Sequence, residues 1–206
     1  TILSRIKGYH GVTVASASSP GDILKVSLQL DGGNPSYRVE RLGQTVVAES
    51  KLGFQLRDGR LDRDLAVLGQ DTRSVDDTWE QPWGERRSVR NHYNEVTVHL
   101  GERSGAKRRL DVVFRVYDDG LGFRYHFPQQ PGLREAIIDD ELTEFAIAPQ
   151  STAWWIPAGE PIHYEYLYQR TPLDQVPLAH TPLTLRSHDG LHVAIHEAAL
   201  VDYAGM

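Results

Sequence analysis

Two stretches of the sequence gather residue types that bind sugars or hard cations. The first, at residues 79–96, reads WEQPWGERRSVRNHYNEV and sets two tryptophans beside carboxylates, amides, arginines and a histidine. Aromatic rings next to carboxylates and amides are typical of a sugar site, but a large β-sandwich also uses them to close its surface. The stretch alone leaves both interpretations open.

The second stretch, STAWWIPAGEPIHYEYLYQR at residues 151–170, surrounds Glu165 with alternating tyrosines, Tyr164, Tyr166 and Tyr168. On a strand, this spacing puts three rings on one face and the carboxylate on the other. Either the strand belongs to the core and its hydroxyls find partners at the edge, or Glu165 is a ligand for a hard cation or a sugar hydroxyl. Glu197 in AIHEAAL poses a similar question, because a lone carboxylate in an apolar strand is costly to bury unless it is paired or metal-bound.

Several other chemistries are excluded by residue type and spacing. The sequence has no cysteine, so it forms no disulfide, thiolate metal site or cysteine nucleophile. It contains no HExxH, no GxSxG and no glycine-rich phosphate loop. His192 and His196 on one strand would lie roughly 13 Å apart, too far to share a zinc ion. A net charge of -6 and a pI of about 5.8 argue against a nucleic-acid partner.

The elements that must position these residues follow a period of two, which is typical of half-buried strands. No stretch has a 3.6-residue apolar stripe of helix length. The long segments 57–94 and 157–180 are predicted to be irregular, as functional or lid-like loops. The sequence therefore predicts one antiparallel all-β sandwich of ten or more strands. The expected strands lie within residues 22–30, 34–56, 95–102, 108–119, 121–128, 143–149, 181–187 and 191–201.

The first residues have features of an export signal. Residues 1–17 end in Ala15-Ser16-Ala17, which is typical of a signal-peptidase site, although the residues before it form a poor apolar region. No apolar run approaches the roughly 18 residues that a membrane span needs. We therefore interpret residues 1–17 as an N-terminal tail or signal-peptide remnant, and residues 18–206 as the domain.

Four motifs in order resemble the N-terminal domain of glycoside hydrolase family 97, a family of α-glucosidases and α-galactosidases. They are WEQPWGERRSVRNHYNEV, YDDGLGFRYHFPQQ (117–130), WWIPAGEPIHYEYLY (154–168) and LHVAIHEAALVDYAGM (191–206). The segment SSPGDILKVSLQLDGGNPSYRV, from Ser18, resembles the opening strands of that domain. The resemblance covers residues 18–206.

The resemblance implies a galactose mutarotase-like β-super-sandwich that packs on a (β/α)8 catalytic barrel, which is absent from this chain. In the family the barrel carries the catalytic carboxylates and acts on α-linked oligosaccharides, by inversion or by retention. An active-site Ca2+ receives a glutamate from the N-terminal domain, and the matching residue here is Glu165 in Glu165-Tyr166-Leu167-Tyr168. The resemblance also favours a periplasmic or secreted protein.

The resemblance leaves other residues with open roles. Glu197 is a candidate substrate contact or a supporting residue behind the metal ligands. Asn91, His92 and Asn94 either hold a loop at the barrel interface, which we favour, or meet sugar hydroxyls. Trp79 and Trp83 are interpreted as buried anchors rather than stacking platforms.

The motif VDYAGM at the end of the chain, Met206, lies inside the domain as the family has it, so we expect a sandwich incomplete at its C-terminal edge. The chain alone is expected to be inactive, as one part of a calcium-dependent, exo-acting α-glycosidase. Two alternatives stay open. One is a stand-alone carbohydrate-binding module. The other is an aldose-epimerase-like enzyme, with Glu165 or Glu197 as base and an acid among His126, His163 and His196.

Overall fold

The computed structural model describes residues 2–3, 11–131, 133–160, 162, 164–199 and 203. Over these residues the chain is built of β-strands, and its one helix is a single 3-10 turn, Leu173–Gln175. No helix in the described part is long and apolar enough to cross a membrane. The chain divides into two compact units, one formed by residues 7–145 and one by residues 146–206 with residues 2–6.

One sheet of the first unit contains β2 (Val12–Ser18), β3 (Leu24–Asp31), β4 (Asn34–Arg41) and β5 (Gln44–Lys51), in the order β5-β4-β3-β2. The short strand β13 (Phe145–Ala146) lies beside β5, and β1 (Ile2–Leu3) belongs to the second unit. Gly32 and Gly33, which join β3 to β4, have φ values of +58° and +101°. A two-residue hairpin turn of this type needs positive φ at both positions, and glycine adopts it without steric cost.

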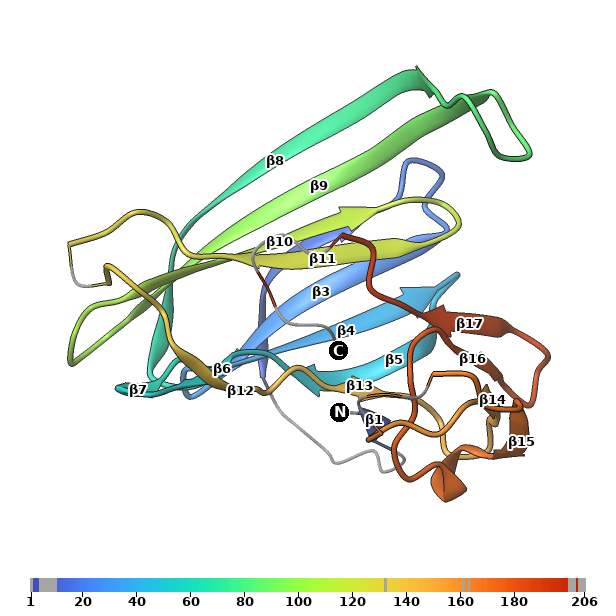
Figure 1. Cartoon of the computed structure of the whole chain (residues 1–206). Coiled ribbons are helices and arrows are strands. Elements are labelled where there is room, and N and C mark those ends of the chain that lie inside the picture. Colours follow the sequence, from blue (N-terminus) through green and yellow to red (C-terminus); the bar gives the residue numbers. More distant parts are fainter. Residues whose placement is uncertain are drawn as a thin grey trace. The chain divides into compact units, whose positions relative to one another are not determined.

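The opposing sheet has the order β11-β10-β9-β8 and is antiparallel throughout (Figure 1). Its strands are β8 (Leu65–Glu80), β9 (Ser88–Glu102), β10 (Arg109–Val116) and β11 (Leu121–His126). A third, small sheet of this unit joins β6 (Phe54–Leu56), β7 (Gly59–Arg60) and β12 (Ile138–Glu141).

The core of the first unit lies between the two large sheets. Alternate residues of each strand point inward and are almost completely buried, including Val26 and Leu28 on β3 and Val98 on β9. The rings of Tyr37 on β4 and Phe114 on β10 meet across the sandwich, with centroids 6.0 Å apart. Burial of these apolar faces is the main force that holds the sheets together.

The second unit has its own four-stranded antiparallel sheet, in the order β15-β14-β16-β17. The strands are β14 (Thr152–Trp155), β15 (Gln169–Pro172), β16 (Leu183–Arg186) and β17 (His192–Ile195). The amide of Ser187 donates to the carbonyl of Leu191 over 2.9 Å and closes the β16–β17 hairpin around Asp189-Gly190. The all-β antiparallel sandwich expected from the sequence is confirmed.

The prediction of an irregular segment over residues 57–94 was wrong. Most of it belongs to β8 and β9, which pair continuously from Leu65↔Glu102 to Glu80↔Ser88 with one register shift. The distal part of β8 is exposed on both faces, so its sequence lacks the apolar–polar alternation by which a half-buried strand is found.

Candidate functional sites

The outer face of the β11-β10-β9-β8 sheet carries the polar residues of the first unit. On β9, Val96, Val98 and Leu100 point into the core, so the residues between them point outward. The register brings Glu95 opposite Arg73 on β8 and Arg115 on β10. The face therefore joins charges from strands that are distant in sequence.

Glu95 lies at the centre of this face and is only 8% exposed. Arg73 donates to both of its oxygens, over 2.6 and 3.0 Å, and Arg115 Nε donates to Oε2 over 2.6 Å. Burial raises the pKa of the Glu95 carboxyl, but the hydrogen bonds and charges of the two guanidiniums outweigh it and leave the pKa lowered. Both guanidiniums also face the ring of Tyr93, at 6.0 and 4.9 Å. This cluster fixes the β8-β9-β10 ladder.

A second polar chain crosses the same sheet through His99. Its Nδ1 lies 2.7 Å from Asp111 Oδ1 and its Nε2 lies 3.0 Å from Asp71 Oδ2. Asp111 also lies 3.0 Å from His126 Nδ1. Since a carboxylate only accepts, His99 serves both acids only as an imidazolium. The hydrogen bonds of Asp111 and then Asp71 raise the pKa of His99 accordingly.

This arrangement predicts a pH-dependent contribution of Asp71 to stability. The pKa of His99 is raised on folding, so the bridge stabilises the folded state fully below about pH 6.5 and is lost as pH rises through the raised value. Asp71→Asn should therefore lower the free energy of unfolding by about 0.2–1 kcal/mol at pH 5.5 and by almost nothing at pH 9. Urea unfolding at both pH values checks this, with Asp77→Asn as the control. An equal loss at both values would contradict it.

The three polar candidates on β9 are held by neighbouring strands. Asn91 Oδ1 accepts a hydrogen bond from Tyr117 over 3.2 Å, and His92 Nε2 lies 4.0 Å from Asp76. Asn94 donates to the carbonyl of Ser18 over 2.9 Å and accepts from Ser74 over 2.7 Å. These contacts give each residue a structural role. Their proposed contacts with the barrel or with sugar hydroxyls stay predictions.

The interpretation of Trp79 and Trp83 as buried anchors was wrong. Trp79 is 50% exposed at the end of β8, and Trp83 is 81% exposed in the turn that follows. The turn carries them away from the sandwich core, because β8 and β9 continue past the neighbouring strand β10 (Figure 1).

In the second unit, β14 and β15 clamp the two ends of the segment that contains Glu165. Trp155 pairs with Gln169 in the ladder, and its indole donates to Thr171 Oγ1 over 3.0 Å. The segment between the strands is irregular over its described residues, as predicted for 157–180, although Gln169–Pro172 of that range forms β15. Pro157 lacks an amide donor and Gly159 has a φ of +107°, which ends the ladder after Trp155.

Glu165 itself is exposed and has no hydrogen bond or ion pair to another described residue. Its neighbour Tyr164 is fixed: the hydroxyl donates to the carbonyl of Thr181 over 2.7 Å, and the ring lies 4.6 Å from that of His180. A free carboxylate on an anchored segment fits one ligand of a hard cation such as Ca2+. No three acidic or histidine side chains among the described residues could hold a metal by themselves.

The other candidates of the second unit lie at the end of its sheet. Glu197 follows β17 and is half-buried, so it is not a lone carboxylate inside an apolar strand as the sequence suggested. It has interactions of its own. His196 is exposed beside it, and His163 lies outside the described residues.

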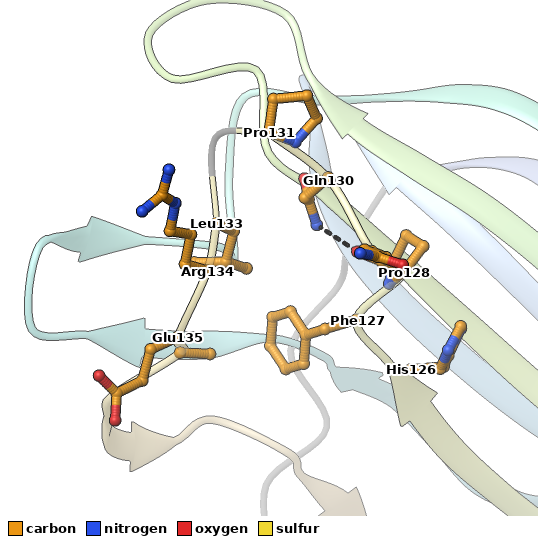
Figure 2. Close-up of a pocket in the computed structure, with 10 residues that line it drawn as sticks. His126, Phe127, Pro128, Gln130, Pro131, Leu133, Arg134 and Glu135 are labelled. Atoms are coloured by element: carbon orange, nitrogen blue, oxygen red, sulfur yellow. Dashed lines mark hydrogen bonds between the residues drawn. The ribbon is translucent and has the colours of Figure 1, made fainter.

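A hollow of about 870 Å3 is formed by the loop from His126 to Ala136 in the first unit. Figure 2 shows Phe127 at its centre, while Arg134 and Glu135 point outward. The buried amide of Gln130 holds the loop to β10 by accepting from Arg109 N over 2.6 Å and donating to Arg109 O over 3.0 Å. Polar groups do not converge on the hollow, so we assign no ligand to it.

Comparison with known proteins identifies the architecture. The family described as "Glycosyl-hydrolase 97 N-terminal" matches residues 17–206. The chain belongs to this family. Its sandwich is thus the N-terminal domain of a family 97 glycoside hydrolase.

Two curated relatives are α-galactosidases. The retaining alpha-galactosidase of Bacteroides thetaiotaomicron is 24% identical over 203 residues, which cover 92% of this chain and 29% of the relative. The probable retaining alpha-galactosidase of Streptomyces bingchenggensis is 33% identical over 129 residues, which cover 62% of this chain and 19% of the relative. The family 97 chain thus spans less than a third of either relative.

Solved structures agree on the fold. A family 97 enzyme from Pseudoalteromonas sp. strain K8, in complex with panose, has a TM-score of 0.89 and 40% identity, over 93% of this chain and 30% of that one. The same enzyme is known in complex with acarbose. A beta-arabinopyranosidase shares the fold, with a TM-score of 0.82 and 24% identity over 91% of this chain and 32% of that one.

Proposed function

We propose that this chain is the non-catalytic N-terminal domain of a calcium-dependent, exo-acting α-glycosidase, an α-glucosidase or an α-galactosidase. The family match over residues 17–206 carries the proposal. One relative is named as a retaining α-galactosidase and one as a probable retaining α-galactosidase, and another is solved with panose and acarbose, which supports α-linked oligosaccharides as substrates. The catalytic carboxylates are assigned to the part of the enzyme that lies outside this chain, a (β/α)8 barrel.

The contribution of this chain to catalysis is the carboxylate of Glu165. The β14–β15 pair and the Tyr164–Thr181 hydrogen bond anchor the segment that carries it. The exposed carboxylate would then complete the coordination of a Ca2+ in the active site and hold the domain to the barrel. When bound, the metal would orient a substrate hydroxyl or the attacking water. Glu197, Asn91, His92 and Asn94 are proposed as supporting or substrate-contacting residues.

We also propose that the enzyme works in the periplasm or outside the cell. The proposal rests on the resemblance to family 97. The Ala15-Ser16-Ala17 motif does not support it, because these residues lie inside β2 and pair with β3, so residues 12–17 are part of the sandwich rather than of a tail. Fractionation of the source cells, with activity measured in each fraction, tests it.

The test of the function is hydrolysis of aryl α-glucosides and aryl α-galactosides. We expect the 206-residue chain to be inactive, and the full-length enzyme to be active with Ca2+ and to lose activity with a chelator. Turnover by the short chain alone would show that the sandwich carries its own active site. Sugar binding by the short chain with chelator present, together with an inactive full-length protein, would favour a carbohydrate-binding module.

A further inference from the structure

The loop that joins β8 to β9 is held at its base by its own hydrogen bonds (Figure 1). Beyond the last ladder pair, the amide of Gln81 donates to the carbonyl of Arg87 over 2.9 Å. The side-chain amide of Gln81 also donates to the carbonyl of Arg86, over 2.8 Å. We call residues 80–87 the hairpin tip. Its ends are thus fixed to each other by both the backbone and a side chain.

Two residues restrict the backbone of the hairpin tip. The ring of Pro82 fixes its own φ. Gly84 has a φ of +115°, which other residues rarely adopt. A Cβ at Gly84 would lie 2.7 Å from Nε2 of Gln81, so a side chain there would displace the amide that bridges the loop. The backbone is therefore restricted on both sides of Trp83, which lies between the proline and the glycine.

Trp83 presents its ring to solvent. It is 81% exposed, more than any other aromatic side chain among the described residues. A large aromatic ring left in water forgoes the burial that usually stabilises it, and a restricted loop that holds such a ring outward is typical of a binding site. The ring borders a hollow of about 550 Å3, whose other lining residues are Glu80, Gln81, Pro82, Gly84 and Arg87.

Polar atoms of this hollow are free to bind a ligand. Arg87 Nε and Nη2 both donate to Oε2 of Glu80, over 3.3 and 3.2 Å. Oε1 of Glu80 and Nη1 of Arg87 therefore make no hydrogen bond to another described residue. Gln81 uses only its Nε2, so its Oε1 is free as well. The hollow thus sets hydrogen-bond acceptors and a donor beside an exposed aromatic ring, unlike the hollow at His126–Ala136.

We propose that the hairpin tip binds α-linked oligosaccharides of neutral hexopyranose units, with Trp83 as the stacking platform. One face of a pyranose ring is lined by C–H groups and packs on an aromatic face, while the hydroxyls at its rim need donors and acceptors. Glu80 and Arg87 supply these as charge-assisted hydrogen bonds, which are the stronger kind. The class of sugar rests on the proposed function, since a similar enzyme is solved with panose and acarbose.

The surroundings of Trp83 favour a sugar over a protein partner. Charged residues occupy four exposed positions within four residues of it, namely Glu80, Glu85, Arg86 and Arg87. The centre of a protein interface is depleted of charged residues. A stable interface also buries about 800 Å2 on each partner, whereas a large aromatic side chain buries only about 150–250 Å2. One ring with polar neighbours is enough for a sugar unit, and too little for a protein surface.

Isothermal titration calorimetry with maltoheptaose, and separately with stachyose, tests the site. It is run on the 206-residue chain and on the full-length enzyme kept inactive by a chelator. Trp83→Ala should weaken binding to the short chain by at least about 10-fold and remove one bound sugar from the full-length enzyme. Gly84→Ala should also weaken binding, although it keeps the ring, because it displaces the amide of Gln81. Leu42→Ala is the matched control, since Leu42 is 65% exposed in another hairpin turn, and it should bind as the unmodified chain does.

The two sugars distinguish the units that the site accepts. Binding of maltoheptaose supports a site for α-glucosyl units, and binding of stachyose supports one for α-galactosyl units. The proposal is overturned if neither sugar binds the short chain, if Trp83→Ala binds as the unmodified chain does, or if Trp83→Ala removes no bound sugar from the full-length enzyme. If the full-length enzyme hydrolyses aryl α-glycosides in any of these cases, the site alone fails. If Trp83-dependent binding is found in a full-length protein that hydrolyses neither aryl α-glycoside with Ca2+, the proposed function fails and the site stands.

Discussion

Glu165→Gln in the full-length enzyme should lower kcat/KM for an aryl α-glycoside by on the order of 100-fold or more at limiting Ca2+. The substitution keeps the shape of the side chain but removes the charge that binds a hard cation. Raising the Ca2+ concentration should recover part of the activity, because an amide oxygen still coordinates calcium weakly. Rate measurements across a calcium titration check both statements.

Glu160→Gln is the matched control for this variant. Glu160 lies in the same irregular segment, is also exposed, and precedes Glu165 by five positions. It should leave the calcium dependence unchanged. Neither variant should alter the urea unfolding of the 206-residue chain, since Glu165 has no partner among the described residues. Equal calcium dependence for both variants would refute the assignment of Glu165 as the ligand.

Strands with one buried face could be predicted from the sequence, whereas strands with both faces exposed to solvent could not. On β3, Val26 and Leu28 alternate with polar residues, and the structure buries both. On β8 every residue from Asp71 to Glu80 except the half-buried Val75 is exposed, so this stretch shows no alternation of apolar and polar residues. The far end of the β8–β9 hairpin was therefore missed, and with it the exposure of Trp79 and Trp83.

The candidate residues on β9 were found by their types, but their partners were not. Glu95 meets Arg73 and Arg115 only because β8, β9 and β10 pair in one particular register. Neither Arg73 nor Arg115 lies near Glu95 in the sequence. If EVTVHL and RLDVVFRV are paired as antiparallel strands, Glu95 and Arg115 fall opposite each other on one face of the sheet. That pairing is the signal that could have indicated this cluster.

Glu165 shows the opposite case. The spacing of the tyrosines around it fits a strand, but the length and composition of 157–180 predict an irregular segment, and the structure has the irregular segment at Glu165. Periodicity alone could not reveal that a proline and a glycine at positive φ would end the ladder before it. The interest in Glu165 as a metal ligand came from the family resemblance, and the structure adds that its carboxylate is exposed.

Phe114→Ala should be the most destabilising single substitution proposed for the sandwich, lowering the free energy of unfolding by about 3–5 kcal/mol. The Phe114 side chain is fully buried, and its ring centroid lies 6.0 Å from Tyr37 and 5.6 Å from Phe123. Truncation leaves a cavity between two paired sheets that cannot collapse freely. Urea unfolding followed by far-UV circular dichroism measures the loss.

Phe127→Ala separates this effect from the loss of any aromatic ring. Phe127 is half-buried at the centre of the loop hollow, and its ring centroid lies 5.4 Å from that of Phe54. Because water can enter the space left by its truncation, Phe127→Ala should lower the free energy of unfolding by less than half as much as Phe114→Ala. Phe114 also lies two residues before the last β10–β9 pair, Val116↔Asn94. Its truncation should speed amide exchange at Val96 and Val98, while residues 75–80 and 88–93, which pair beyond the end of β10, should change little. Equal losses for the two variants would contradict a core shared between the sheets.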